Sequence, residues 1–210
     1  MTPSIPVNEL VVLTADKNCQ FALRGLLTRF HSLKIRQVTP DYRLHPQKDP
    51  GILRGAHDFL RTFSKTHAHA LVLMDREGSG REALTREAME ERIENALKNA
   101  GWDDRAAAVV IDPELEIWVW SDSPHVAAEL GWSQRKTDLP SWLEQKGYLG
   151  ENEVKPLRPK EALEAALRVV RKPRSSALYR TLAEKVGLTK CIDPAFAKLK
   201  TVLQDWFAEA

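Results

Sequence analysis

The sequence has 210 residues, of which 43% are apolar and 29% charged, and its 31 basic and 29 acidic side chains nearly balance. This composition excludes a disordered chain, a collagen-like fibre and a membrane-embedded protein, because it provides an ordinary apolar core without any run of about 18 apolar residues. The two cysteines, Cys19 and Cys191, lie far apart without zinc-finger spacing, so we expect neither a disulfide framework nor a structural zinc site.

The charge is distributed unevenly along the chain. Residues 1–66 hold 10 basic and 5 acidic side chains, residues 67–150 hold 9 and 16, and residues 151–210 hold 12 and 8. Carboxylates at this density are either spread over solvated helices or gathered around a cation, and basic flanks suit a polyanion such as nucleic acid. The first ten residues show no leader pattern, so we expect a cytoplasmic protein without membrane contact.

The first third of the chain predicts alternating strands and helices. The apolar run Leu10–Thr14 is typical of a strand, and a helical pattern follows the acidic turn at Asp16. Lys34–Val38 is predicted as a second, more polar strand. Residues 39–51 contain three prolines and are predicted as an irregular loop, and Ile52–Phe63 as a helix.

The middle third continues the alternation. Ala70–Met74 is a continuous apolar run, which is typical of a buried parallel strand. Residues 81–100 show helical periodicity that ends at Gly101, and Ala106–Ile111 is predicted as the next strand. Asp112 before a proline predicts a helix N-cap, so residues 114–120 begin either a short helix or a further strand.

The last third is predicted to be helical. No strand pattern recurs after about residue 123. Proline-based helix starts are found at Ser123-Pro124, Leu139-Pro140, Arg158-Pro159 and Asp193-Pro194. We therefore predict an α/β fold with a mostly parallel, Rossmann-like sheet over residues 1–122 and a helical subdomain over residues 123–210.

Acidic residues follow every strand of the predicted parallel sheet. They are Asp16 after the first strand, Asp75 and Glu77 after the second apolar run, and Asp112, Glu114 and Glu116 after the third. Ligands bind at the carboxyl ends of parallel strands, and several carboxylates held close together need a cation such as Mg²⁺ or Mn²⁺. The alternative is that these acids cap the helices that follow them, as Asp112 is placed to do.

A basic cluster late in the chain offers a second recognition feature. The cluster suits phosphate contacts and consists of Arg168, Arg171, Lys172 and Arg174, with Lys155, Arg158 and Lys160 upstream. A solvated helix surface is the equal alternative, because exposed charges are common on soluble proteins.

These motifs together resemble a protein family. Leu13-Thr-Ala-Asp16, Leu71-Val-Leu-Met-Asp75-Arg-Glu77 and Ile111-Asp-Pro-Glu-Leu-Glu116-Ile-Trp-Val-Trp, with the late Cys191-Ile-Asp-Pro-Ala-Phe196, are similar to motifs of small Toprim-like (topoisomerase–primase domain) proteins of bacterial anti-phage defence islands. The resemblance covers residues 8–122, and the match is nearest to a component of a methylation-associated defence system.

The resemblance implies a Mg²⁺- or Mn²⁺-dependent site for phosphoryl transfer on nucleic acid. It places Asp16, Asp75 and Glu77 in catalytic positions, with Asp16 as general acid or base. It further implies metal ligation by Asp75, Glu77 and Glu116, and phosphate contacts by Lys17, Arg76 and Arg81. Asp16 stands where the family has a glutamate, and Glu77 where it has a second aspartate.

Those departures leave a second function class open. A catalytically silent interaction or sensor subunit would use the same fold to dock other defence-system proteins, such as an ATPase or a methyltransferase. A third reading, a small-molecule phosphatase or nucleotide-binding module, has less support, because the sequence carries neither a P-loop nor a dinucleotide glycine motif.

Overall fold

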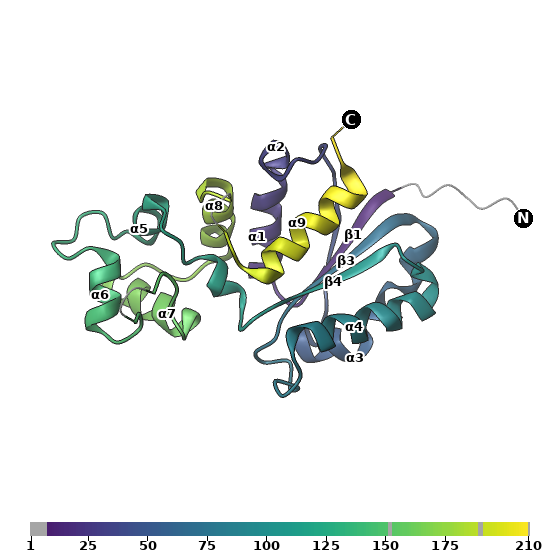
Figure 1. Ribbon diagram of the computed structural model, residues 1–210, viewed down its shortest axis with the longest axis horizontal. Coiled ribbons are helices and arrows are strands. Elements are labelled where there is room, and N and C mark those ends of the chain that lie inside the picture. The colour runs from purple at the N-terminus through teal and green to yellow at the C-terminus, as the bar shows by residue number, and fades with distance from the viewer. Residues whose placement is uncertain (1–7, 151–152, 189–190, 210) are drawn as a thin grey trace, which may run out of the picture.

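The computed structural model describes residues 8–150, 153–188 and 191–209. Residues 1–7 lie outside the described residues. They make up most of the first ten residues, in which the sequence shows no leader pattern. The fold is α/β, with four parallel strands in the order β2-β1-β3-β4 and helices on both faces of the sheet (Figure 1). The predicted α/β class with a parallel sheet and a helical C-terminal part is therefore confirmed.

Three of the four strands coincide with the apolar runs of the sequence. They are β1 (Asn8–Thr14), β3 (His67–Asp75) and β4 (Ala106–Ile111). β3 lies between the other two, in a register that pairs Val12 with Leu71 and Leu73 with Val109. Parallel strands with both faces covered are apolar throughout, because neither set of alternating side chains meets water. This explains why these strands were predictable.

The second strand was predicted wrongly. Residues 34–38 form no strand, because Lys34 adopts a left-handed conformation (φ 58°) and closes the short helix α2 (Phe30–Leu33). The strand β2 (Asp41–Leu44) lies instead inside the segment predicted as a loop, and pairs with β1 alone. Its half-buried, partly polar side chains and flanking prolines are typical of an edge strand.

The helices between the strands begin and end at other residues than predicted. They are α1 (Lys17–Leu27), α3 (Lys48–Leu60) and α4 (Arg86–Leu97), with single turns η1 (Arg61–Lys65), η2 (Lys98–Trp102) and η3 (Leu115–Trp118). Thr85 caps α4 by accepting the Ala88 N–H at 3.2 Å, which starts this helix five residues later than predicted. Asp112 caps no helix and instead forms an ion pair with Arg76 at 2.7 Å.

The C-terminal helices are α5 (Pro124–Leu130), α6 (Leu139–Gln145), α7 (Pro159–Val170), α8 (Ser176–Lys185) and α9 (Pro194–Phe207). Four of them follow the proline signals closely, and the fifth, α8, begins after the N-cap Ser175 instead. No strand follows residue 123 within residues 124–150, 153–188 and 191–209. In the part of the chain that the structure describes, no helix has both the length and the apolar character needed to cross a bilayer.

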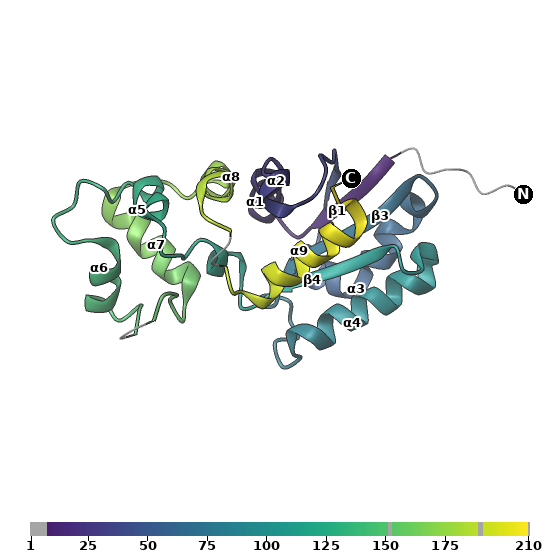
Figure 2. The ribbon, with the colours of Figure 1, turned by 45° about the horizontal axis from the view of Figure 1, so that its top comes forward.

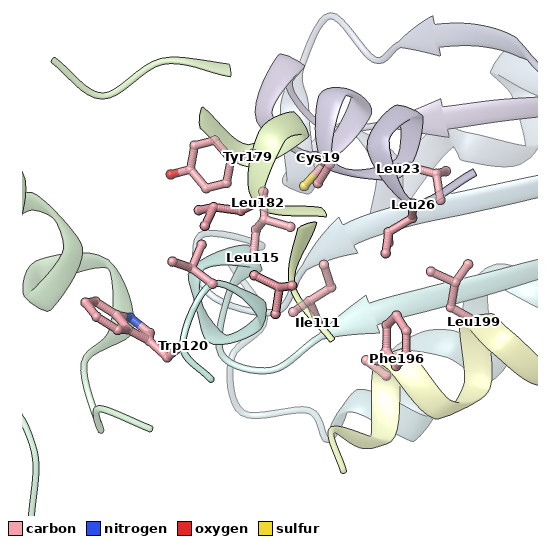
Figure 3. Packing of buried hydrophobic residues seen from close by; sticks show 14 of the residues in the cluster. Cys19, Leu23, Leu26, Ile111, Leu115, Trp120, Tyr179, Leu182, Phe196 and Leu199 are labelled. Carbon is pink, nitrogen blue, oxygen red and sulfur yellow. The ribbon is translucent and has the colours of Figure 1, made fainter. Parts of the chain in front are cut away.

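The two faces of the sheet are covered by helices from different parts of the chain. Helices α3 and α4 cover one face, where Val11, Val72 and Val110 are buried. Helices α1 and α9 cover the other, over the alternating residues Val12 and Leu71 (Figures 1 and 2), and α8 packs against α1 (Figure 3). α8 and α9 thus lie beyond the predicted boundary at residue 122 but belong to the same apolar core as the sheet.

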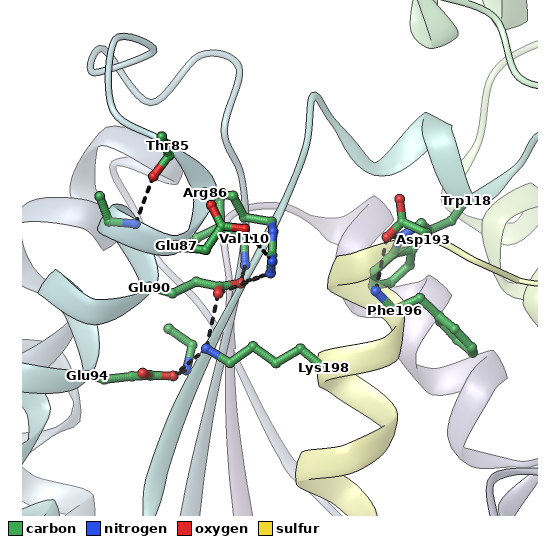
Figure 4. A network of polar contacts seen from close by, with 12 residues as sticks. Thr85, Arg86, Glu87, Glu90, Glu94, Val110, Trp118, Asp193, Phe196 and Lys198 are labelled. Atoms are coloured by element: carbon green, nitrogen blue, oxygen red, sulfur yellow. Dashed lines mark hydrogen bonds and ion pairs between the residues drawn. The ribbon is translucent and has the colours of Figure 1, made fainter.

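Side chains of α4 close the exposed edge of β4. Glu90 accepts the Val110 N–H at 3.0 Å, and Glu94 accepts the Ala108 N–H at 3.0 Å (Figure 4). Lys198 of α9 donates to both carboxylates, at 3.1 and 2.7 Å. These contacts occupy the N–H groups that a further strand would need, so the sheet ends at β4.

Replacing Glu90 tests this edge. Glu90→Ala removes the acceptor of the buried Val110 N–H and one counter-charge of Arg86 and Lys198, so we expect the free energy of unfolding to fall by about 2–4 kcal/mol. Urea denaturation measures the loss. Glu91→Ala, at an exposed position of the same helix, should change it by less than about 0.5 kcal/mol. Equal losses in both variants would contradict the proposed role of Glu90.

Candidate functional site

The carboxyl ends of the four strands open into a polar cavity of about 730 Å³. We call it the acidic cavity. Its acidic lining residues are Asp16, Asp49, Asp75, Glu77, Glu82, Glu114 and Glu116, and its other lining residues include Asn18, Lys48, Lys160 and Arg174. Carboxylates from all four strand ends therefore meet at one place, as parallel topology requires.

Three aspartates each use one oxygen to hold a loop of the cavity. Asp16 caps α1 by accepting the Cys19 N–H at 2.9 Å. Asp49, in the first turn of α3, accepts the Asp75 N–H at 2.9 Å. Asp75, at the end of β3, accepts the Leu115 N–H at 3.0 Å. In each case the bonded oxygen is Oδ1, which leaves Oδ2 for a further partner.

The electrostatics of the cavity are dominated by like charges. Burial, followed by the charges of Asp49 and Glu116, raises the pKa of the Asp75 carboxyl well above its ordinary value. Burial also raises the pKa of Asp49, with a contribution from Asp16. Neither Asp16, Asp49 nor Asp75 forms an ion pair with any residue that the structure describes. The three aspartates therefore have no cationic partner among the described residues, and the charged form of Asp75 is disfavoured.

Glu116 is held by the helical part of the chain. It is 1% exposed, and its Oε1 accepts hydrogen bonds from the Tyr179 hydroxyl and from Arg174, both at 2.5 Å. Arg174 also pairs with Glu164 at 3.0 Å. Burial and the Glu116 charge raise the pKa of Tyr179, so this hydroxyl remains a donor at every physiological pH.

Glu114 is paired with a different cation, Lys160. Its Oε1 accepts the backbone N–H of Lys160 at 3.1 Å, and its Oε2 lies 3.3 Å from the Lys160 ammonium group. Burial, with the neighbouring Glu116, raises the pKa of Glu114. The two glutamates after β4 are therefore compensated by Lys160 and Arg174, while the aspartates are not.

The structure brings together only part of the predicted site. The predicted residues that line the acidic cavity are Asp16, Asp75, Glu77, Glu116 and Arg174. Those outside its lining are Lys17, Arg76, Arg81, Arg171 and Lys172. Among these, Arg76 is engaged by Asp112 and by the Glu82 carbonyl at 2.7 Å, and Lys172 donates to the Glu129 carbonyl.

Asp49, Lys48 and Lys160 are among the lining residues that lie outside the predicted site, although Lys160 belongs to the predicted basic cluster. Asp49 follows β2, and the rule that acids follow strand ends would have found it had β2 been placed correctly. Lys48 has φ 50°, a left-handed conformation that a non-glycine residue rarely adopts, and such strain clusters at functional sites. Lys160 comes from α7, and nothing in the local sequence predicted its approach to Glu114.

The donor atoms of the acidic cavity fit a hard divalent cation. Carboxylate oxygens are the ligands of Mg²⁺ and Mn²⁺, and a cation would relieve the repulsion that raises the pKa of Asp75. Within the described residues no group of three or more His, Cys, Asp or Glu side chains is arranged to hold a metal ion. Mg²⁺ usually takes only one or two carboxylates and completes its shell with water and phosphate oxygens, so a site of this kind would need only one or two of these side chains.

Comparisons with known proteins identify no relative of this chain. No protein-family model matches the sequence, no curated protein is significantly similar to it, and no solved structure matches its fold significantly.

The raised pKa of Asp75 predicts a pH-dependent stability. The folded state retains this proton where the unfolded chain has lost it, so stability falls as the pH rises above about 4. Asp75→Asn keeps an acceptor for Leu115 and removes the charge. We expect it to raise the free energy of unfolding at pH 7 by on the order of 1 kcal/mol, with the gain vanishing towards pH 4.

Urea denaturation across this pH range measures the effect. Asp205→Asn serves as the control, because Asp205 is an exposed aspartate of α9. A neutral-pH gain in the control as large as in Asp75→Asn, or none in Asp75→Asn, would contradict the prediction.

The buried contact of Glu116 with Arg174 and Tyr179 predicts a large loss of stability when the arginine is removed. Arg174→Met leaves a buried carboxylate without its counter-charge, so we expect the free energy of unfolding to fall by about 3–5 kcal/mol. Adding Glu116→Gln to this variant should recover part of the loss. Arg168→Met, at an exposed arginine of α7, is the control. A double variant no more stable than Arg174→Met would show that charge is not the cause.

Proposed function

We propose that the acidic cavity is a Mg²⁺- or Mn²⁺-dependent site for phosphoryl transfer on nucleic acid, in a cytoplasmic protein of a prokaryotic anti-phage defence system. The observation that carries the chemistry is the meeting of Asp16, Asp75 and Glu77 in one cavity, where burial and neighbouring carboxylates disfavour the charged form of Asp75. The defence setting rests on the resemblance of residues 8–122 to Toprim-like proteins, and on nothing else.

In this proposal Asp75 and Glu77 hold the ion. Both hydrogen bonds to Glu116 go to Oε1, so Oε2 is the atom through which Glu116 would join them. The bound ion would supply a Lewis acid that withdraws charge from a phosphoryl oxygen. Asp16 would exchange a proton through Oδ2, since its Oδ1 is held by the N-terminus of α1.

Cationic residues in and around the cavity would bind the phosphates. Arg174 and Lys48 line the cavity, and Arg174 has the planar, multidentate donor set that suits phosphate. Lys17, Arg81 and Arg171 lie outside the lining and would contact the backbone of a longer nucleic acid. Arg76 and Lys172 would do so only after leaving the Asp112 carboxylate and the Glu129 carbonyl, to which they are bonded.

A second candidate is a catalytically silent interaction or sensor subunit that docks another defence protein. The observation that favours it is the pairing of Glu114 with Lys160 and of Glu116 with Arg174. In this case those pairs are permanent, and the cavity stabilises the fold without binding an ion.

Calorimetric titration with Mg²⁺ and Mn²⁺, together with incubation with single-stranded, duplex and supercoiled DNA, separates the two candidates. The first predicts ion binding and cleavage by the intact protein. Asp75→Asn should weaken ion binding at least about tenfold and abolish cleavage, because it removes a charged oxygen ligand. Asp205→Asn should leave both unchanged.

Each negative result of these experiments leads to a different conclusion about the acidic cavity. Ion binding without cleavage of any of the three DNA forms would reject cleavage of nucleic acid as the function and retain the ion site. Absence of both signals in the intact protein would reject the phosphoryl-transfer proposal in favour of the silent subunit. Cleavage that survives Asp75→Asn would place the chemistry outside the acidic cavity.

A further inference from the structure

Helices α5, α6 and α7 form a lobe that stands apart from the sheet (Figures 1 and 2). The loop between α5 and α6 carries a pocket of about 400 Å³, which we call the tryptophan pocket. It is lined by Trp132, Gln134, Arg135, Lys136, Thr137 and Trp142. The tryptophan pocket shares no lining residue with the acidic cavity, so it is a separate feature of the surface.

Three aromatic rings contact one another in a row at this pocket. Trp132 and Trp142 have ring centroids 4.9 Å apart, and Trp142 stacks on Tyr148 with centroids 6.2 Å apart. Trp132 is 2% exposed, and its indole donates to the Thr137 carbonyl at 2.9 Å, which holds the loop against the ring. Trp142 and Tyr148 are only half-buried, so part of each ring reaches solvent. Such rings offer a stacking surface to flat groups such as nucleic-acid bases.

A cation is held beside these rings without an acidic partner. The guanidinium group of Arg135 lies over the Trp132 ring, 5.1 Å from its centroid. Arg135 and Lys136 are exposed, and the side chain of neither forms an ion pair or hydrogen bond with any residue that the structure describes. A contact with a ring orients an arginine without using its N–H groups, so these remain available to a phosphate or to a stacked base.

The charge of the tryptophan pocket is positive. Its charged lining residues are Arg135 and Lys136, and no acidic side chain lines it. The nearest acid in the sequence, Asp138, caps α6 and accepts the N–H and the hydroxyl of Ser141, each at 2.9 Å. This carboxylate is therefore bonded to α6. An anion at the pocket meets two cations with which no described carboxylate pairs.

Rings beside unpaired cations match the chemistry of single-stranded nucleic acid. Its bases stack on aromatic rings, and its phosphates bind arginine and lysine. The bases of a duplex stack on one another and do not reach a ring on a protein surface. A proline-rich peptide would use the rings without needing the cations. The two features together therefore favour a single strand.

We propose that the tryptophan pocket binds single-stranded nucleic acid, with a base against Trp142 and adjacent phosphates on Arg135 and Lys136. This inference rests on the proposed function, in which nucleic acid is the substrate. It adds the form of that nucleic acid and a contact surface separate from the acidic cavity. A strand held by the lobe would be present at the acidic cavity at a raised effective concentration.

The test measures the fluorescence anisotropy of a labelled oligothymidylate of about 16 nucleotides, a length that covers the site of one single-strand-binding domain. EDTA is present, so that neither a metal ion nor cleavage contributes. We expect saturable binding that weakens as the salt concentration rises, and weaker binding of a duplex of the same length. Oligouridylate of the same length distinguishes RNA from DNA, and binding of either supports the proposal.

Two variants test the two kinds of contact. Trp142→Ala should weaken binding at least about fivefold, the effect of one lost base stack. Arg135→Gln should weaken binding and lower the slope of log affinity against log salt concentration by about 0.7, the effect of one lost phosphate contact. Arg92→Gln is the matched control, because it removes the same charge from an exposed arginine of α4, outside the lining.

Thermal unfolding shows whether Trp142→Ala is folded, and the exposed Arg135 keeps the test decisive if that variant is not. The proposal would be overturned by absence of binding to the intact protein, by a duplex that binds as tightly as the single strand, or by equal binding of Arg135→Gln and Arg92→Gln. Failure of the proposed function is distinguishable, because ion binding and cleavage are measured separately and their absence leaves binding in EDTA unchanged.

Discussion

The rest of the structure depends on the buried contact of Glu116 with Tyr179 and Arg174. A carboxylate that is 1% exposed requires both a counter-charge and hydrogen-bond donors, and α8 and the segment before it supply them at 2.5 Å. Glu116 stands just beyond β4, so the contact fixes α8 at the edge where the strands end. α8 also packs on α1, which covers one face of the sheet. The position of α8 therefore affects both the wall of the acidic cavity and the packing on this face of the sheet.

The balance of charge at the carboxyl ends of the strands determines which ligands the acidic cavity can bind. Parallel strands bring acids from four loops together, and the chain compensates only those after β4, through Lys160 and Arg174. Asp16, Asp49 and Asp75 are fixed by backbone amides instead, and a backbone amide supplies no net charge. Amide contacts hold a carboxylate in place but do not offset the burial and the neighbouring carboxylates that raise the pKa of Asp75. A rigid set of like charges is what a cation site requires before the cation arrives.

The sequence predicts the parts of this fold that local chemistry determines. Buried strands such as β3 must be apolar on both faces, so an apolar run is sufficient to find them. The edge strand β2 pairs on one side only and keeps half-buried, partly polar side chains, so no run marks it. Asp49 was missed for the same reason. The partners of Glu114 and Glu116 lie 46 or more residues away, and only tertiary packing brings them near.

Tyr179 connects the acidic cavity to the apolar packing behind it. Its ring packs in the apolar core, and its hydroxyl donates to Glu116 in the wall of the acidic cavity. A change in packing that displaced the ring would lengthen this hydrogen bond and leave Glu116 with Arg174 as its main partner. The position of the Glu116 carboxylate in the acidic cavity therefore depends on how α8 packs, and not only on the loop after β4.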